Sequence, residues 1–387
     1  MKKLPYFDGN DVQLLHCGGE FFSALVAEIE SARQEIYLET YLFSHDQTAN
    51  AVRDALIAAA ARQVSVRVVI DWLGSGRHQA QALTQYLQAG GVQCRCFNPW
   101  FTRGLARTHR KIVVIDQRVA FVGGVNIIDD FISDDGWDHV LPFPRWDFAV
   151  QIQGPLVGHV HLEVEAQWRK TGRLGLLSRL ALLRDLYTAS PTGDVPLSRA
   201  ALIVRDNLRH RASIQKAYLY ALGNARHRAI LVTPYFAPGR KFRRALIVAA
   251  SRGVEVILLI GVGQFVLQDA VAHSYYPKLL RRGVRLVEYR KTQLHAKVAV
   301  IDQDWATVGS SNVDGLSLFV NHEANVVIED EAFSLKLTSE LQRGITDGVE
   351  VRLEDYVNKP WYKRAWYGFA YLVYRALMRL VTFGSYG

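Results

Sequence analysis

The sequence has little of what marks a secreted or disulfide-bonded protein. Only three cysteines occur among 387 residues, and an odd number cannot pair completely within one chain. Cys94 and Cys96 fall in a predicted strand, where we expect them on opposite faces. Together with Cys17 they are interpreted as reduced residues of a cytosol-facing protein, without a disulfide framework or a metal cluster.

Long apolar runs are also missing. No segment reaches the roughly 18 uninterrupted apolar residues that suggest a membrane-spanning helix. The first fifteen residues, MKKLPYFDGNDVQLL, contain two lysines but no apolar run behind them, so no signal peptide is expected. Any contact with a membrane is therefore predicted to be peripheral.

Acidic residues are absent after Asp355, in a stretch that is rich in aromatic and basic residues. Within this stretch, Lys359 to Arg379 reads KPWYKRAWYGFAYLVYRALMR, and its apolar centre is too short to cross a bilayer. Aromatic residues mixed with lysine and arginine are typical of the headgroup region of an anionic membrane. The alternative is a terminal helix that packs on the core and has a basic outer face.

The composition is that of a globular protein with an excess of positive charge. Hydrophobic residues make up 49% of the chain and charged residues 21%, and 46 Lys+Arg against 37 Asp+Glu give a net charge of +9. This balance favours an anionic partner, either nucleic acid or an anionic membrane surface, and charge alone does not choose between them.

Predicted strands alternate with predicted helices in both halves of the chain. The predicted strands are 12–15, 35–41, 65–71 and 92–97 and then 229–235, 254–260 and 284–289; the predicted helices are 20–33, 50–62 and 79–89 and then 214–225, 240–252 and 272–281. This alternation predicts an α/β fold with mixed, mainly parallel sheets that are flanked by helices.

Because the same pattern occurs twice, we predict two similar lobes related by a pseudo-twofold axis. The first lobe is assigned to residues 1–190, the second to 191–355, and a membrane-association segment to 356–387. Residues 188–198, TASPTGDVPLS, are rich in Pro, Gly, Ser and Thr and are predicted to contain the linker.

One polar signature occurs in each half. The first copy, THRKIVVIDQRVAFVGGVN, runs from Thr108 to Asn126, and the second, LHAKVAVIDQDWATVGSSN, from Leu294 to Asn312. Each has a His, a Lys two residues later, an Asp five residues after that, a pair of small residues and a final Asn. Two copies with the same spacing indicate a shared function rather than chance.

The signatures supply six candidates for catalysis, His109, Lys111 and Asp116 in the first copy and His295, Lys297 and Asp302 in the second. Residues i and i+2 of a strand share a face, so the His and Lys of each copy can point at one ligand. The aspartates have the opposite parity, and bracing the strand suits them better than touching that ligand.

Each signature is predicted to form a hairpin that brings its asparagine back beside its His and Lys. Asn126 and Asn312 are therefore candidate phosphate ligands, and Gly123-Gly124 and Ser310-Ser311 keep side chains small where a ligand approaches. Whether the Ser310 hydroxyl contributes to the site stays open. If the lobes face each other, the pocket is cationic and rich in donors, which suits a phosphoryl group.

Two histidines can divide the work of phosphoryl transfer. One attacks phosphorus, and the other protonates the leaving oxygen and later deprotonates the acceptor. An imidazole must present the correct nitrogen, so a carboxylate is expected behind each ring. Asp147 and Glu323, which begin apolar strands after the two signatures, are the candidates for orienting the rings.

The paired HxKxxxxD signatures resemble those of the phospholipase D superfamily, and the duplicated plan spans Asp11 to about Asp330. The phrases THRKIVVID, FVGGVN, ATVGSSN and NHEANV are similar to bacterial cardiolipin synthases of the short type without N-terminal transmembrane segments. The resemblance implies a duplicated phospholipase D-like fold with one active site between the lobes, and neither metal nor other cofactor. It also implies roles, namely nucleophile for His109, acid and base for His295, and phosphate binding for Lys111, Lys297, Asn126 and Asn312.

The resemblance further implies transfer of a phosphatidyl group from one phosphatidylglycerol to His109 and then to a second phosphatidylglycerol. The implied partners are anionic phospholipids and the cytoplasmic face of the bacterial inner membrane, without nucleic acid; no oligomeric state is indicated. Alternatives are a lipid hydrolase, a phospholipase D-family nuclease, since a basic chain with a phosphate pocket suits DNA equally well, and a non-enzymatic binder of anionic lipid. The aromatic and basic C-terminal stretch argues against the nuclease.

Three further segments keep two interpretations each. The acidic insert with Asp129, Asp130, Asp134, Asp135 and Asp138 could bind a metal, but its irregular spacing favours a solvated loop that could act as a gate. The loop 98–107, with Trp100 and Phe101, either lines an entrance for an acyl chain or packs. The basic, leucine-rich segment 167–184 is either a membrane contact or an inter-lobe helix.

Overall fold

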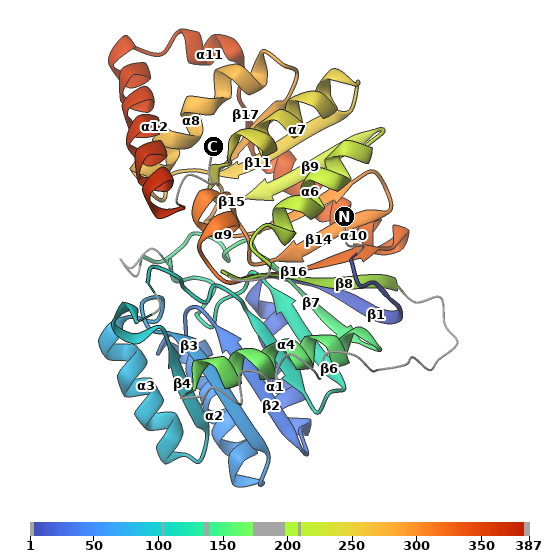
Figure 1. Cartoon of the computed structure of the whole chain (residues 1–387), viewed down its shortest axis with the longest axis vertical. Helices are drawn as coiled ribbons and strands as arrows, with labels where there is room; N and C mark the ends of the chain where they lie inside the picture. The colour runs from blue at the N-terminus through green and yellow to red at the C-terminus, as the bar shows by residue number, and fades with distance from the viewer. Residues whose placement is uncertain (1–3, 103, 135–138, 173–197, 208–209, 383–387) are drawn as a thin grey trace.

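The computed structural model describes residues 4–102, 104–134, 139–172, 198–207 and 210–382. Within these ranges a 15-stranded sheet runs through the whole molecule, and a small two-stranded sheet lies beside it. Helices cover both faces of the large sheet, and the two halves of the chain occupy its two ends (Figure 1). The predicted α/β class is confirmed.

The elements of the first half are β1 (Phe7–His16), α1 (Cys17–Ser31), β2 (Glu35–Thr40), α2 (Gln47–Ala61), β3 (Ser65–Asp71), α3 (Arg77–Ala89), β4 (Gln93–Phe97), the short 3₁₀ helix η1 (Pro99–Phe101), β5 (Ile112–Ile115), β6 (Val119–Gly123), β7 (Phe148–Gln153) and α4 (Leu156–Thr171). In the second half, helix α8 begins at Val266, six residues before the predicted start at residue 272. The elements of the second half are β8 (Ser198–Arg205), α6 (Ser213–Asn224), β9 (Arg228–Thr233), β10 (Phe236–Ala237), α7 (Arg240–Ser251), β11 (Glu255–Gly261), α8 (Val266–Leu280), β12 (Arg285–Tyr289), β13 (Val298–Ile301), β14 (Trp305–Gly309), β15 (Val313–Asp314), α9 (Gly315–Phe319), β16 (Glu323–Glu329), α10 (Glu331–Asp347), β17 (Val349–Glu350), α11 (Leu353–Val357) and α12 (Trp361–Val381).

The strand order is β17-β12-β11-β9-β13-β14-β16-β8-β1-β7-β6-β5-β2-β3-β4. Read outward from the β8–β1 junction, the two halves repeat each other, with β16, β14, β13, β9, β11 and β12 on one side matched by β7, β6, β5, β2, β3 and β4 on the other. This order has the pseudo-twofold relation that the repeated sequence predicts.

The expectation of mainly parallel sheets is wrong in its detail. Neighbours are parallel only at β2–β3, β3–β4, β9–β11 and β11–β12, and the other described pairings in the large sheet are antiparallel. The reason is that each signature forms a hairpin, and hairpins add antiparallel strands to a βαβ sheet. Both halves share one sheet because β1 pairs with β8.

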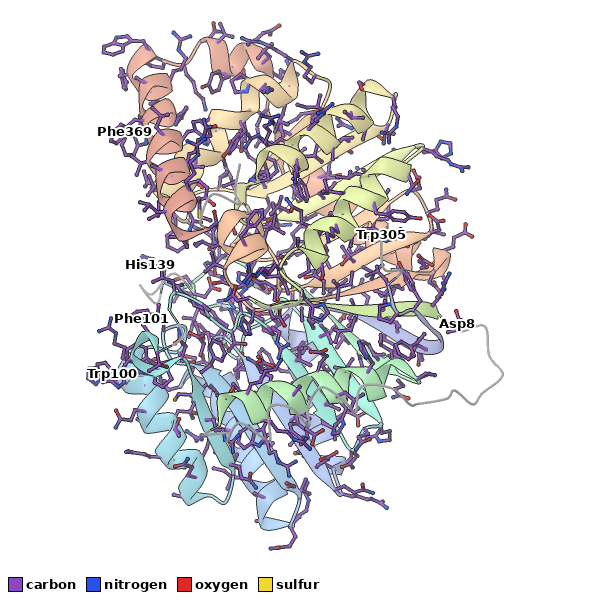
Figure 2. The ribbon with its side chains drawn as sticks, viewed as in Figure 1. Asp8, Trp100, Phe101, His139, Trp305 and Phe369 are labelled. Atoms are coloured by element: carbon purple, nitrogen blue, oxygen red, sulfur yellow. The ribbon has the colours of Figure 1, made fainter. Side chains whose placement is uncertain are left out.

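Apolar side chains alternate across the sheet and build cores on both faces. One face of β5 places Ile112 and Val114 in a core that both halves share and that α4 and α10 cover. The other face places Val113 and Ile115 in a core with α1, α2 and α3. The second half has its own core under α6, α7 and α8, and Trp305 lies within it (Figure 2). The shared core ties the two signature hairpins together.

Smaller expectations are also corrected. Both Cys94 and Cys96 contact the hydroxyl of Thr84 through their sulfur atoms, so they lie on the same side of β4, as residues two apart in a strand must. The linker prediction and most of the segment 167–184 fall on residues 173–197, outside the described residues, so the proposed domain boundary stays a prediction. Among the helices that the structure describes, none has the length and apolar character to span a bilayer.

Candidate active site

The two signatures meet where the two halves of the sheet adjoin. The backbone N–H of His109 donates to the carbonyl of His322, at 2.9 Å, and that of His295 donates to the carbonyl of Trp146, at 2.9 Å. Each signature histidine is therefore held by the backbone of the other half. The residue after each of these acceptors is a candidate orienting carboxylate, Glu323 in one case and Asp147 in the other.

This pairing places the carboxylates across the interface between the halves. Glu323 Oε2 lies 3.0 Å from His109 Nδ1, and Asp147 Oδ2 lies 2.5 Å from His295 Nδ1. A nitrogen that faces a carboxylate carries the proton, which leaves Nε2 of each ring with its lone pair. Each half thus supplies the carboxylate that the imidazole of the other half contacts.

The two carboxylates have different surroundings. The Ser310 hydroxyl donates to Glu323 Oε2 at 2.5 Å, and the Ser310 carbonyl lies 3.0 Å from His109 Nδ1. Asp147 instead accepts from its neighbour, the backbone N–H of Phe148, at 2.8 Å. A Cβ built on Gly124 would come within 2.3 Å of Asp147, so a side chain larger than hydrogen has no room there.

The register of the small residues corrects the sequence-based pairing. Gly123 ends β6 and Gly309 ends β14, so Gly124 is equivalent to Ser310, and the expected match of Gly-Gly with Ser-Ser is shifted by one residue. A Cβ on Gly123 would meet Ala149 at 2.5 Å, and one on Gly309 would meet Asn325 at 2.3 Å. These glycines let the strand beside each carboxylate approach closely.

Both signature lysines are buried, and the charge of Lys297 acts on Lys111. Lys111 is 5% and Lys297 is 1% exposed, and each donates to the carbonyl of the histidine two residues earlier. Burial lowers the pKa of Lys111 to about 7, with a further contribution from Lys297, and burial lowers that of Lys297 to about 8. Two buried ammonium groups that repel each other favour an anion between them.

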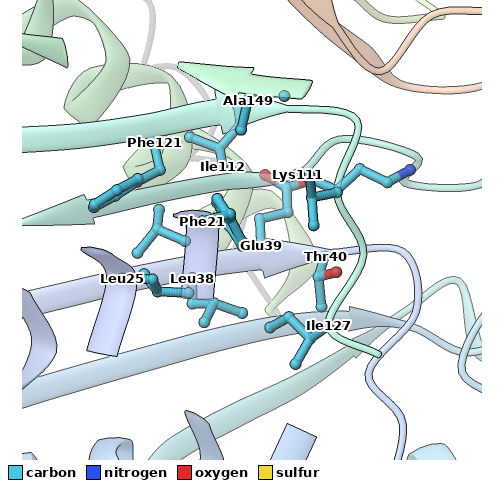
Figure 3. Close-up of a pocket in the computed structure, with 13 residues that line it drawn as sticks. Phe21, Leu25, Leu38, Glu39, Thr40, Lys111, Ile112, Phe121, Ile127 and Ala149 are labelled. Atoms are coloured by element: carbon cyan, nitrogen blue, oxygen red, sulfur yellow. The ribbon is translucent and has the colours of Figure 1, made fainter. Parts of the chain in front are cut away.

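Lys111 reaches this position past the core of the first half. Figure 3 shows its amino group pointing away from Phe21, Leu25 and Leu38, which line a cavity of about 10 Å³. That volume holds at most one water molecule. The cavity belongs to the core, and only the stem of Lys111 borders it.

Burial also sets the charge of the imidazoles. It lowers the pKa of His109, and burial together with the charge of Lys297 lowers the pKa of His295 well below its ordinary value. Burial raises the pKa of Asp147 to about 6. At neutral pH the free site therefore holds neutral imidazoles that donate Nδ1–H to carboxylates.

The two signature asparagines are buried, and each has an amide oxygen without a hydrogen bond in the described part of the chain. Asn126 is 2% and Asn312 5% exposed, and the Oδ1 atom of each is buried without a hydrogen-bond partner among the described residues. Buried polar atoms are ordinarily paired. Both amides are thus placed to meet a ligand.

Asp134 was interpreted as part of a solvated loop, and this is wrong. Its side chain is 7% exposed, and Oδ2 lies 3.4 Å from His295 Nε2, while Oδ1 accepts from Gln293 Nε2 at 2.6 Å. Asp130 is also buried and accepts from the backbone of Gly18, whereas Asp135 and Asp138 lie outside the described residues. The Asp134 carboxylate therefore lies beside Nε2 of His295, the ring nitrogen that does not face Asp147.

The Asp134→Asn variant is expected to bind inorganic phosphate roughly tenfold more tightly, because a negative charge a few ångströms from the bound anion is removed. Calorimetric titration of the purified protein with phosphate measures this. Asp129→Asn, in the same segment but bonded to Thr48 and Phe131, is the control. Equal affinities in both variants would mean that phosphate does not compete with Asp134.

The remaining two candidates, Asp116 and Asp302, lie away from the site, at the turns of the hairpins. Asp116 accepts from the backbone N–H groups of Arg33, Gln34 and Glu35. Asp302 accepts from Arg226, His227 and Arg228. Both contacts join a signature hairpin to the start of the neighbouring strand, as bracing residues would.

Replacing Asp302 by alanine is expected to lower the free energy of unfolding by about 1–3 kcal/mol, because three backbone donors lose a charged acceptor. Burial opposes ionisation, but the three donors lower the pKa of Asp302 below its usual 3.8. This stabilisation is therefore present above pH 3.8 and lost as the pH falls through the lower, folded-state value. Urea unfolding at pH 7 and pH 3 measures it, and Asp304→Ala, exposed in the same turn, should change neither curve.

Sequence reasoning missed several residues around the histidines. The ring of Tyr41 packs edge-on against His109 with centroids 4.9 Å apart, and Arg145 donates to Gln293 Oε1 at 3.0 Å behind Asp134. Tyr41 follows β2 at the position that Pro234 occupies after the equivalent β9, so the internal repeat held no signal for it. Nothing in the local sequence marks Arg145, because its partner Gln293 is distant in the chain.

Within the described residues, no group of three or more His, Cys, Asp or Glu side chains is arranged to hold a metal ion. His159 and His161 lie in helix α4. His161 Nε2 faces Glu35 at 2.9 Å. That contact gives His161 a structural partner outside the site.

Known proteins with this organisation are similar over most of the chain. A family described as cardiolipin synthase, phospholipase D-like domain, matches residues 25–135 and 218–345. Cardiolipin synthase B of Salmonella typhimurium is 36% identical over 347 residues, which cover 88% of this chain and 81% of that protein. Cardiolipin synthase B of Escherichia coli K12 is 36% identical over 346 residues with the same coverage.

More distant proteins share the fold. Cardiolipin synthase of Clostridium perfringens strain SM101 is 28% identical over 361 residues, 91% of this chain and 74% of that protein. The crystal structure of phosphatidylserine synthase from Haemophilus influenzae Rd KW20 superimposes with a TM-score of 0.71 at 13% identity, and the match covers 98% of this chain and 97% of that one. This likeness supports the fold alone.

Proposed function

Because this chain belongs to the cardiolipin synthase family of phospholipase D-like proteins, we propose that it moves a phosphatidyl group from one phosphatidylglycerol to another and releases glycerol. The chain is a phosphatidyltransferase, and its substrates are phospholipids. The observation that carries the specific reaction is the crossed arrangement of two imidazoles, each oriented by a carboxylate of the other half, around two buried lysines.

In the first step, Nε2 of His109 attacks the phosphorus atom of phosphatidylglycerol. The bond from phosphorus to the headgroup glycerol breaks, and His295 gives a proton to the departing oxygen. The bound phosphodiester supplies the negative charge that raises the pKa of His295 and lets it carry this proton. Lys111, Lys297, Asn126 and Asn312 bind the phosphoryl oxygens, where charge develops in the transition state.

In the second step, the now neutral His295 takes a proton from a headgroup hydroxyl of another phosphatidylglycerol. That oxygen attacks phosphorus, the bond from phosphorus to His109 breaks, and cardiolipin leaves. The acceptor alcohol must outcompete water, which a site closed against a membrane favours. No step requires a metal ion.

Incubation of the purified protein with phosphatidylglycerol vesicles tests this proposal. Cardiolipin and glycerol in equal amounts are the expected products. Phosphatidic acid in their place would identify a lipid hydrolase. Cleavage of DNA with unchanged lipid would identify a nuclease. Either phosphatidic acid or DNA cleavage in place of cardiolipin would overturn the proposed transfer.

Helix α12 is proposed to hold the enzyme on the cytoplasmic face of the bacterial inner membrane as a peripheral protein. Its inner side is docked, since Tyr371 packs on Tyr275 of α8 with ring centroids 5.5 Å apart and the Tyr374 hydroxyl accepts from the backbone of Gly315. The outer side exposes a stripe of large apolar residues, namely Trp361, Tyr362, Trp366, Phe369, Leu372, Val373, Leu377 and Leu380. A docked helix with a merely basic outer face would not have this stripe.

The double variant Trp366→Asp/Phe369→Asp is expected to bind phosphatidylglycerol vesicles at least about tenfold more weakly, since two aromatic side chains no longer enter the interface and two negative charges are added. Co-sedimentation with vesicles measures the binding. Val248→Asp, an exposed apolar residue on α7, is the control. Undiminished binding by the double variant would remove α12 as the membrane contact.

A further inference from the structure

The loop between β4 and the first signature has three residues in an unfavourable backbone conformation. Asn98, Trp100 and Phe101 have φ values of 53°, 55° and 55°, in the left-handed region that is unfavourable for side chains other than glycine. The buried Asn98 amide donates to the carbonyls of Gly104 and Ala106, at 2.8 and 2.7 Å. Strained residues that are held in place by such bonds are typical of functional segments.

This loop exposes large apolar side chains to solvent. Trp100 is 76% exposed, Leu105 58% and Phe101 41%. Their base is rigid, because the buried Trp72 ring lies 5.1 Å from the Trp100 ring and 5.6 Å from the Phe101 ring. We call Trp100, Phe101 and Leu105 the wedge. Exposing such apolar side chains to water has an unfavourable free energy, and their transfer into an apolar phase is favourable.

The wedge is connected directly to the nucleophile. The chain continues from Leu105 through Arg107, which donates to the Tyr41 hydroxyl at 3.2 Å, and the Tyr41 ring packs on His109. The carbonyl of Arg107 also accepts from the backbone of His322 in the second half, at 2.8 Å. The loop that carries the wedge is therefore linked, through Arg107 and Tyr41, to the ring of His109.

The wedge and helix α12 project from the same side of the molecule. Figure 2 shows Trp100 and Phe101 from the first half and Phe369 from the second half along one edge, with His139 between them. One helix alone leaves a protein free to rotate about the helix axis at a surface. A second insertion point at a distance removes that freedom and fixes which way the site faces.

We propose that the wedge inserts into the phospholipid bilayer and, together with α12, seats the mouth of the active site against the headgroups. The argument for a bilayer as the occupant is chemical. Tryptophan and phenylalanine favour the interfacial region, and the guanidinium of Arg77 lies over the Trp72 ring at 5.1 Å, ready to meet anionic headgroups. This proposal rests on the proposed function, because its substrate is itself a lipid of that bilayer.

The test compares Trp100→Ser/Leu105→Ser with the control Tyr86→Ser, whose side chain on α3 is 53% exposed. Turnover is measured on phosphatidylglycerol vesicles and on dispersed short-chain phosphatidylglycerol below its micelle concentration. We expect the double variant to lose about tenfold or more on vesicles and to keep its rate on the dispersed lipid. The control should keep both rates.

Insertion itself is measured by quenching of tryptophan fluorescence with vesicles of brominated phosphatidylglycerol. The part of the quenching that disappears in Trp100→Phe belongs to Trp100 and is expected to be large for bromines near the headgroups. Absence of that difference, or equal vesicle rates in all variants, overturns the wedge. Loss of rate on the dispersed lipid as well would make the loop an entrance for acyl chains and also overturn it. Failure of the unaltered protein on both lipids would instead contradict the proposed function.

Discussion

Turnover of phosphatidylglycerol is expected to fall by at least about 10⁴-fold when His109 is replaced by alanine, because no other group can form the bond to phosphorus. The variant keeps the lysines and asparagines that bind phosphate, so it should still bind lipid. Thin-layer separation of labelled phosphatidylglycerol and cardiolipin measures the loss. Removal of the nucleophile thus separates chemistry from binding.

A matched variant of the second histidine should show the other half of the mechanism. In His295→Asn the first step lacks its acid and the second lacks its base, so turnover is expected to fall steeply, and a phosphatidyl group that reaches His109 is expected to stay there, where intact-protein mass spectrometry detects the added mass. Cys94→Ser is the control, since the Cys94 thiol is buried and burial raises its pKa to about 12, which makes it inert. An active His109→Ala protein, or an adduct on His295 of the unaltered protein in place of His109, would contradict the assignment.

The carboxylates behind the rings should matter almost as much. Glu323→Gln and Asp147→Asn are each expected to lower the rate by about 10²–10⁴-fold, because an amide can donate to Nδ1 and so stabilise the tautomer that lacks the lone pair at Nε2. Glu323 is 0% and Asp147 2% exposed, and the amides have nearly the same size. The change is therefore chemical rather than one of packing.

Rapid-quench measurement of glycerol release in the first turnover distinguishes this role from a purely structural one. Both variants should slow the release and keep the unfolding midpoint of the unaltered protein within a few degrees. Glu329→Gln, at the far end of β16 from Glu323, is the control and should release glycerol normally. If the two amide variants released glycerol as fast as the control, the carboxylates would not orient the imidazoles.

Because of the crossed contacts, each half of the duplicated chain completes the hydrogen bonding of the histidine in the other half. His109 takes its carboxylate from the second half, and His295 takes its carboxylate from the first. In the part of the chain that the structure describes, neither signature histidine is hydrogen-bonded through Nδ1 to a carboxylate of its own half. The shared core under α4 and α10 keeps these pairs in register, which explains why one continuous sheet carries both halves.

Much of the fold followed from local patterns. Strand β3 has the bounds predicted for it, and most other elements differ by a few residues at their ends, because periodicities of two and 3.6 residues are properties of short segments. The parallel arrangement was predicted too broadly, because the sequence shows that strands alternate with helices but does not show which strands pair.

The sequence by itself determined that the molecule is a duplicated α/β protein with two equivalent polar hairpins, since spacing within a strand decides which side chains share a face. Only the tertiary structure decided which carboxylate serves which histidine, and that Asp134 and Arg145 lie buried beside the site. The contacts of Glu323 with His109, of Asp147 and Asp134 with His295, and of Arg145 with Gln293 each join residues more than 140 positions apart in the chain. They form only because β1 pairs with β8 and so brings the two halves together, and local sequence does not show which strands pair.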